Sequence, residues 1–314
     1  MDSLVRAAEF FFDHVTEIGW GAVCIAVLAH LGKVAARTRA WRNILAVSYP
    51  EERVRWRHVA GGYTAGVAVN AVVPIRGGDV LKLYLVKHRV EGATYPTLGA
   101  TLLVESIFDL AIGAVLLGYA LWVGALPALE VLPHLPSIDW FWLLDNPATT
   151  LIVLAALAAV GLSLFLLAAE RIEAFRERVA QGFAALRQPR RYVRTVVGWQ
   201  AVAFILRLIT VFFFLRAFGV TATLDNALLA QVSQSLAGIV PLTPSGIGTE
   251  QALLAYVLRG EAPTRSLLSF SFGMEFVLIT VNVLLGFLAL VLMARTFRWR
   301  RLLHREPGLT PDEA

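Results

Sequence analysis

The sequence contains little cysteine and little charge, and both shortages narrow the classes of protein to which it can belong. Cys24 is the one cysteine among 314 residues, which excludes a disulfide framework and a cysteine-rich metal site. Charged residues make up 16% of the chain and hydrophobic residues 57%. Soluble domains average about 25% charged and about 45–50% apolar residues. Glycine and proline are too few for a linker or a collagen-like chain. The composition therefore predicts a chain whose solvent is lipid.

Five apolar stretches are long enough to cross a bilayer as helices, which takes about 20 residues. These stretches lie at about 18–36, 97–124, 148–169, 195–216 and 266–293. Two shorter apolar stretches, at about 58–74 and 226–241, end in Val-Pro, and a glycine-rich turn and a short helix follow each of them. We therefore predict an all-α, polytopic integral membrane protein with about five spanning helices and two re-entrant or short helical segments.

The net charge of +5 indicates topology rather than a nucleic-acid partner. Most basic residues fall in connections between the apolar stretches, at 33–57, 76–89, 170–194 and 295–305. Basic residues collect on the cytoplasmic side of membrane proteins. The pattern predicts a multi-pass protein of the cell (inner) membrane, with an outer segment at 1–17 and a cytoplasmic tail at 296–314. The two short segments then dip into the membrane from opposite sides.

The order of span, dipping segment, glycine-rich turn, short helix and span occurs twice, at about 18–124 and 195–293. Inverted repeats with interrupted segments are typical of transporter sites, although two ordinary short helices are the alternative. We predict one transmembrane domain over 18–295. The span 148–169 and an amphipathic helix at 170–190 link the repeats. Its apolar and basic faces indicate a helix on the inner leaflet, or else a linker helix without lipid contact.

Polar residues inside the predicted spans are candidates for a translocation path, because each charge there costs about 2.5–3.5 kcal/mol. The residues expected to line the path are Glu105, Asp109, Arg207, Gln231, Gln234, Glu275 and Asn282. One arginine faces three acids, so we expect the surplus acids to be protonated or to pair with Arg76 or Lys82. The alternatives are a structural pair between Arg207 and a carboxylate, and, for the glutamines, bonds that only join helices.

The two glycine-rich turns are candidates for binding an anionic headgroup. Glycine lets the backbone approach a ligand, and the helix N-termini that follow offer free N–H groups. The candidates near the first turn are Asn70, Pro74, Arg76, Gly78, Asp79 and Lys82. Those near the second are Thr243, Pro244, Ser245, Gly246, Gly248 and Glu250. The alternative is that Asp79 only caps its helix and that Lys82 only faces the cytoplasm.

Three segments together resemble the transmembrane region of lysylphosphatidylglycerol synthases, a family often called flippase-like. The run Asn70-Ala-Val-Val-Pro74-Ile-Arg76-Gly-Gly78-Asp79 resembles its motif N-x-x-x-P-x-R-x-G-[ED]. Val104-Glu105-Ser-Ile-Phe-Asp109 resembles V-E-R-x-x-D, and the run from Pro241 to Glu250 resembles a P-x-T-P-G-G-x-G element. The resemblance covers about 20–295. Ser106 stands where the family has a basic residue, and Met274-Glu275 stands where an arginine is common.

The resemblance implies a membrane protein that moves aminoacylated phospholipid between leaflets, or one that accompanies envelope or lipid-linked sugar pathways. Fused relatives carry a C-terminal aminoacyl-transferase domain. This chain ends roughly twenty residues after the last predicted span, so we expect the stand-alone form. The two departures alter the charge expected around the substrate.

We therefore expect a translocase for a lipid or lipid-linked headgroup, with membrane lipids and an enzyme that supplies the lipid as partners. The alternative is a non-transporting accessory subunit of an envelope lipid or glycolipid pathway. A polytopic glycosyltransferase is less favoured, because Glu130, Asp139 and Asp145 are scattered in the outer loop. A membrane phosphatase would need a histidine where Ile247 stands. The sequence contains no metal-ligand cluster or phosphate-binding loop, so we expect no metal, no cofactor and no enzyme.

Overall fold

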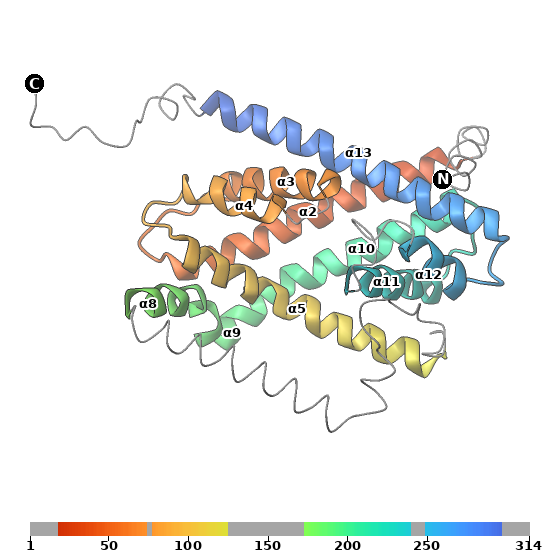
Figure 1. The fold of residues 1–314 in the computed structure, drawn as a ribbon, viewed down its shortest axis with the longest axis horizontal. Coiled ribbons are helices and arrows are strands. Elements are labelled where there is room, and N and C mark those ends of the chain that lie inside the picture. The colour runs from red at the N-terminus through yellow and green to blue at the C-terminus, as the bar shows by residue number, and fades with distance from the viewer. Residues whose placement is uncertain (1–17, 74–76, 125–172, 240–248, 297–314) are drawn as a thin grey trace, which may run out of the picture.

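The computed structural model describes residues 18–73, 77–124, 173–239 and 249–296, and its regular elements are helices (Figure 1). One isolated bridge joins Arg259 and Ala262. The first half holds α2 (Trp20–Ser48), α3 (Trp56–Val72), α4 (Gly77–Lys87) and α5 (Tyr95–Trp122). The second half holds α10 (Gly198–Ala217), α11 (Leu224–Ile239), α12 (Thr249–Val257) and α13 (Thr264–Thr296). The prediction of an all-α membrane protein is confirmed.

Four of the described helices are long and apolar enough to cross a membrane: α2, α5, α13, and α10 with the turns before it. They match four of the five predicted spans, and the fifth, 148–169, lies outside the described residues. The predicted limits of the first span are wrong, because α2 continues to Ser48. No glycine or proline interrupts the chain after Lys33, and the extension buries Trp41, Ile44 and Leu45. Lys33 and Arg37 are therefore helical rather than part of a loop.

Contacts between helix ends define two ends of the bundle. At one end Asn43 of α2 donates to the carbonyl of Thr195, and Arg89, just after α4, donates to the carbonyl of Met293 in α13. At the other end the N–H of Gly19 donates to the carbonyl of Ala217. The helices α2 and α10 therefore run between the same two ends of the bundle. They lie side by side although they are far apart in the sequence.

Two helical hairpins enter the bundle from opposite ends (Figure 1). In the first, α3 and α4 are antiparallel, because Gly62 lies against Val86 and Gly66 lies against Gly78. In the second, α11 and α12 are antiparallel. Asn226, near the start of α11, donates to Glu261, which follows α12. Each hairpin returns to the end at which it starts, which is the geometry that the two predicted dipping segments require.

The helices α2 and α10 form the centre of the bundle, where they pack antiparallel along most of their length. Gly32 gives room for Leu206, and the hydroxyl of Thr210 donates to the carbonyl of Ala26. Around this pair, α13 packs on the α3–α4 hairpin and α5 packs on α11. The interior therefore receives side chains from both halves of the chain.

The segment predicted as one amphipathic helix at 170–190 is interrupted within its described part, from residue 173 onward. It contains α8 (Glu173–Gly182), a 3₁₀ turn (Ala184–Arg187) and α9 (Pro189–Tyr192), and a π-helical stretch (Val193–Val197) leads into α10. Gly182, the last residue of α8, packs directly against Ala100 of α5, where a side chain would collide. Gln181 donates to the carbonyl of Ser48, so α8 covers the ends of α2 and α5.

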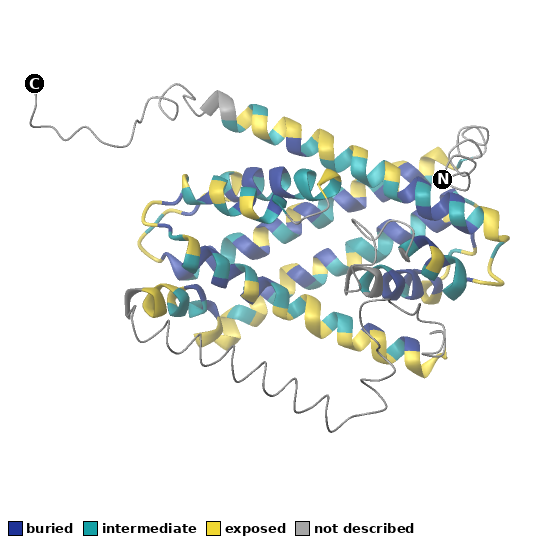
Figure 2. Ribbon diagram, in the orientation of Figure 1, coloured by how far each residue is buried: buried dark blue, intermediate teal, exposed yellow. Residues whose placement is uncertain are grey.

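The outward faces of the long helices are apolar. Figure 2 shows exposed residues along α5 and α13, and they include Leu110, Val115, Leu284, Phe287 and Leu288. Large apolar side chains in such continuous rows are unfavourable in water. These faces therefore suit contact with lipid.

Candidate functional site

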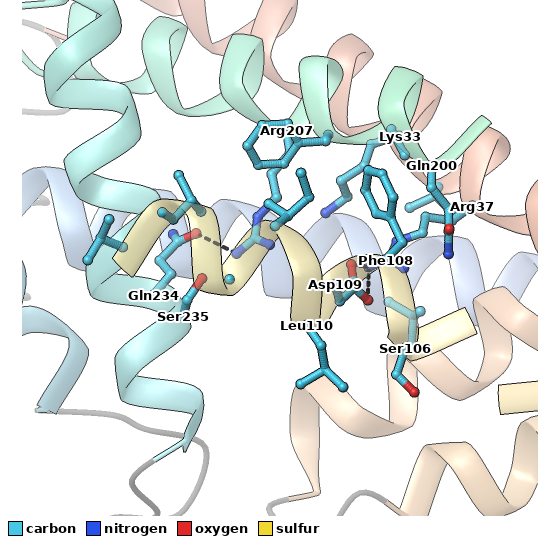
Figure 3. Close-up of a pocket in the computed structure, with 18 of the residues that line it drawn as sticks. Lys33, Arg37, Ser106, Phe108, Asp109, Leu110, Gln200, Arg207, Gln234 and Ser235 are labelled. Carbon is cyan, nitrogen blue, oxygen red and sulfur yellow. Dashed lines mark hydrogen bonds and ion pairs between the residues drawn. The ribbon is translucent and has the colours of Figure 1, made fainter. Parts of the chain in front are cut away.

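A cavity of about 780 Å³ lies between α2, α3, α5, α10, α11 and α13. Its polar wall is formed by His30, Lys33, Arg37, Asp109, Arg207, Gln234 and Asn282. Figure 3 shows Arg207 and Lys33 reaching toward the same space from the neighbouring helices α10 and α2, with Asp109 and Arg37 joined beside it. Lys33 lies near the middle of α2 and Arg207 near the middle of α10. The polar residues are thus far from both ends of the bundle.

On the first-half side, Arg37 is paired with two acids of α5. Its Nη2 donates to both carboxylate oxygens of Asp109, at 2.8 and 2.7 Å, and its Nη1 lies 3.7 Å from Glu105 Oε1. Hydrogen bonds between two charged groups are shorter and stronger than those between neutral groups. Arg37 therefore ties α2 to α5 at the wall of the cavity.

Glu105 lies behind that wall and has a second partner, Lys82 of α4. Lys82 Nζ is 3.0 Å from Glu105 Oε2, and both side chains are buried. The same ammonium lies 4.3 Å from the ring centre of Trp41 and 4.2 Å from that of Tyr63, within the range of cation–π attraction. The expected pairing of a surplus acid with Lys82 is thus present, and the alternative that Lys82 only faces the cytoplasm is wrong.

On the second-half side, polar side chains are joined mainly through amides. Arg207 Nη2 donates to Gln234 Oε1 at 3.2 Å, and Gln231 Nε2 donates to the same oxygen at 3.2 Å. Glu250 interacts with Gln234 and, through its charge, with Arg207 and Glu275. Arg207 has no carboxylate within 4 Å among the described residues. The structural pair with a carboxylate, the alternative role that the sequence left open for Arg207, is therefore not found in this part of the chain.

Two further hydrogen bonds join α13 to other helices in this part of the bundle. His30 Nε2 lies 2.8 Å from Asn282 Oδ1, which joins α2 to α13 across the two halves. Gln251 Nε2 donates to Glu275 Oε2 at 2.6 Å, which joins α12 to α13. Asn282 lines the cavity, whereas Glu275 and the buried Gln231 do not.

Of the residues predicted for the translocation path, Asp109, Arg207, Gln234 and Asn282 line one cavity, and Glu105 lies behind its wall. Of those predicted for the headgroup, Asn70, Gly78 and Asp79 join α3 to α4. The N–H of Gly78 donates to Asn70 Oδ1 at 2.8 Å, and Asn70 Nδ2 lies 3.4 Å from Asp79. Asp79 lies in the first turn of α4, which begins at Gly77. The remaining candidates, Pro74, Arg76, Thr243, Pro244, Ser245, Gly246 and Gly248, lie outside the described residues.

Lys33, Arg37, His30 and Tyr63 line the cavity without having been predicted. Lys33 and Arg37 are four residues apart and so share a helix face, but their basic character placed both in the predicted connection 33–57. The sequence predicted that one arginine, Arg207, faces three acids in the path, and this prediction is wrong for the cavity. The cavity wall carries three basic side chains and Asp109, so its charge is positive rather than negative.

A bundle of long apolar helices with a polar cavity among them defines an integral membrane protein. The chain belongs to the family of the lysylphosphatidylglycerol synthase TM region, whose model matches residues 11–286. This match confirms the resemblance of the three sequence motifs. A UPF0104 membrane protein of Methanocaldococcus jannaschii is 26% identical over 197 residues, which cover 61% of this chain and 79% of that relative. No solved structure was found to match the chain.

Proposed function

We propose that this protein is a translocase that carries the anionic headgroup of a lipid, or of a lipid-linked molecule, through the cavity between its two halves. The observation that carries the proposal is the position of Lys33, Arg37 and Arg207 on the wall of one interior cavity. Charges inside a membrane are costly and mark substrate or ion pathways. Their shared location favours a negatively charged cargo.

The α5 side of the cavity supports a lipid as the cargo. Leu110 and Leu117 line the cavity and are 73% and 39% exposed, and Gly113 and Ala114 between them have little or no side chain. The cavity therefore adjoins an apolar outer surface. A headgroup could enter along α5 while its acyl chains stay in the bilayer.

The two hairpins support alternating access. They enter from opposite ends of the bundle (Figure 1), and α3 and α11 each contribute residues to the cavity wall. In our proposal, movement of one hairpin opens the cavity toward one leaflet while the other hairpin keeps it closed. The basic α8–α9 region then faces the cytoplasm of the cell membrane, following the distribution of basic residues. The protein performs no covalent chemistry in this proposal, uses no cofactor, and receives its lipid from a separate enzyme.

Transport in vesicles tests the proposal. The purified chain is reconstituted with a fluorescent anionic phospholipid, and loss of fluorescence after a membrane-impermeant quencher is added measures exchange between leaflets. We expect exchange well above that of protein-free vesicles. Equal rates would refute the translocase and favour a non-transporting accessory subunit.

The Arg207→Gln variant connects transport to the cavity. Arg207 has an amide partner rather than a carboxylate within ion-pair distance in the described chain, so its removal leaves no paired acid uncompensated. A hydrogen bond to a charged group contributes about 1.5–3 kcal/mol, so we expect transport to fall about tenfold or more. The matched control is Arg216→Gln, an exposed arginine of the same helix, which should retain the wild-type rate.

A further inference from the structure

The basic side chains of the cavity differ in how far their charge is already balanced. Arg37 has Asp109 and Glu105 within ion-pair distance. Within the described residues, Lys33 and Arg207 have no carboxylate within 4 Å. Two positive charges at this wall therefore remain without a direct counter-ion, one from α2 and one from α10.

The unbalanced charges act on one another. Lys33 interacts unfavourably with both Arg207 and Arg37, because like charges near one another in a poorly hydrated interior repel. Glu250 is close enough to attract Arg207. However, Glu250 also interacts with Gln234 and Glu275, and it does not line the cavity. A ligand with two negative charges would relieve the repulsion between Lys33 and Arg207 and complete the balance.

We infer that Lys33 and Arg207 together bind a dianionic phosphate monoester, in preference to the singly charged phosphate diester of common phospholipids. A phosphomonoester carries about −1.5 to −2 charges at pH 7 and three acceptor oxygens. Arginine offers a planar fork for two of these oxygens, and lysine offers a mobile point charge for the third. The inference rests on the proposed function, and it names the class of headgroup that the cavity takes.

The same phosphomonoester chemistry could come from a lipid or from a small water-soluble molecule. The exposed apolar residues Leu110 and Leu117 at the cavity wall favour the lipid. Both sources enter the experiment. Phosphatidic acid is the lipid probe, phosphatidylglycerol is the diester control, and glycerol 3-phosphate is the soluble phosphomonoester.

The first measurement is the rate of exchange between leaflets for acyl-labelled phosphatidic acid and phosphatidylglycerol, at pH 5 and pH 7. The second ionisation of a phosphomonoester lies near pH 6, so the dianion fraction falls about tenfold between pH 7 and pH 5. We expect the ratio of the two rates to fall about tenfold with it, both in the wild-type chain and in Lys33→Arg, whose guanidinium keeps its charge over this range. A ratio near one, or one that does not change with pH, would overturn the inference and leave lipid translocation standing.

Variants locate the selectivity. Lys33→Gln and Arg207→Gln should each lower the ratio of phosphatidic acid to phosphatidylglycerol transport about tenfold at pH 7, whereas Lys33→Arg should keep most of it. The exposed Arg39 of α2 and Arg216 of α10 provide the matched controls, Arg39→Gln and Arg216→Gln, which should keep the wild-type ratio. Selectivity that survives both cavity substitutions would contradict the assignment.

Binding in detergent separates failure of the inference from failure of the proposed function. Short-chain phosphatidic acid should raise the melting temperature of the wild-type protein more than short-chain phosphatidylglycerol does, and it should lose this effect with Arg207→Gln. If vesicles show no transport, this difference still supports the phosphomonoester site, and its absence refutes that site. An equal effect of glycerol 3-phosphate would support the headgroup class and assign its source to solution rather than to lipid.

Discussion

The buried pair between Lys82 and Glu105 gives the most direct prediction about stability. Replacement of Lys82 by methionine keeps the length of the side chain but removes the ammonium 3.0 Å from Glu105 and its contacts with Trp41 and Tyr63. Glu105, only 6% exposed, would then depend on Arg37 at 3.7 Å. Loss of one partner of a buried pair costs about 3–5 kcal/mol.

A cost of this size should lower the melting temperature by about 6–20 °C, since 1 kcal/mol corresponds to about 2–4 °C in chains of 150–250 residues. The double variant Lys82→Met/Glu105→Gln leaves no unpaired carboxylate, so it should recover at least half of the loss. The matched control is Lys87→Met. Lys87 belongs to the same helix and lies 4.3 Å from the ring centre of Tyr95, a contact with a contribution of about 0.5–1 kcal/mol.

The assay is thermal unfolding of the purified protein in one detergent, followed by fluorescence-detected gel filtration after heating. Lys82→Met should lose much more stability than Lys87→Met, and the double variant should be more stable than the sum of its two single changes. Equal losses for Lys82→Met and Lys87→Met would refute the reasoning. So would strict additivity, since it would mean that the carboxylate and the ammonium do not interact.

Three other predictions follow from the packing and from the proposed topology. Asn70→Ala removes the acceptor of the Gly78 N–H and should destabilise the protein by about 1–3 kcal/mol, measured by the same thermal assay. Gly286→Leu should abolish the close contact of α13 with Ala68 of α3 and lower the yield of monodisperse protein, and a normal gel-filtration profile would contradict this packing. In a variant without Cys24, cysteines introduced at Lys87 and Gly260 should be labelled by an impermeant reagent from opposite sides of the membrane, whereas labelling from one side would refute the opposed hairpins.

The long apolar helices could be predicted because hydrophobic length alone determines them. The extent of α2 could not, because its second half alternates charged and apolar residues and resembles a loop in a hydropathy window. That half is helical because one face of it packs against other helices and buries Trp41 and Leu45. Because the predicted first span ended too early, Lys33 and Arg37 were expected in a cytoplasmic connection rather than inside the membrane.

The candidate site shows the same division. Asp109 and Arg207 were predicted because isolated charges in apolar spans are easily recognised. Their partners were not, since contacts between α2 and α5, or between α10 and α11, depend on how distant segments pack. The close approach of Gly182 to Ala100 in another helix could not be predicted either. The net charge of such a cavity depends on which helices pack around it. Counting charged residues along the sequence does not give that charge.

The length of α13 has a consequence for the membrane around the protein. Its 33 residues extend about 50 Å at 1.5 Å per residue, whereas the hydrocarbon core of a bilayer is about 30 Å thick. The helix must therefore tilt or project into the headgroup region, and a thicker bilayer would reduce that mismatch. Because α13 packs mainly on α3, a change in bilayer thickness that reorients α13 would also act on the first hairpin. The lipid composition of the host membrane would then help to set the position of that hairpin.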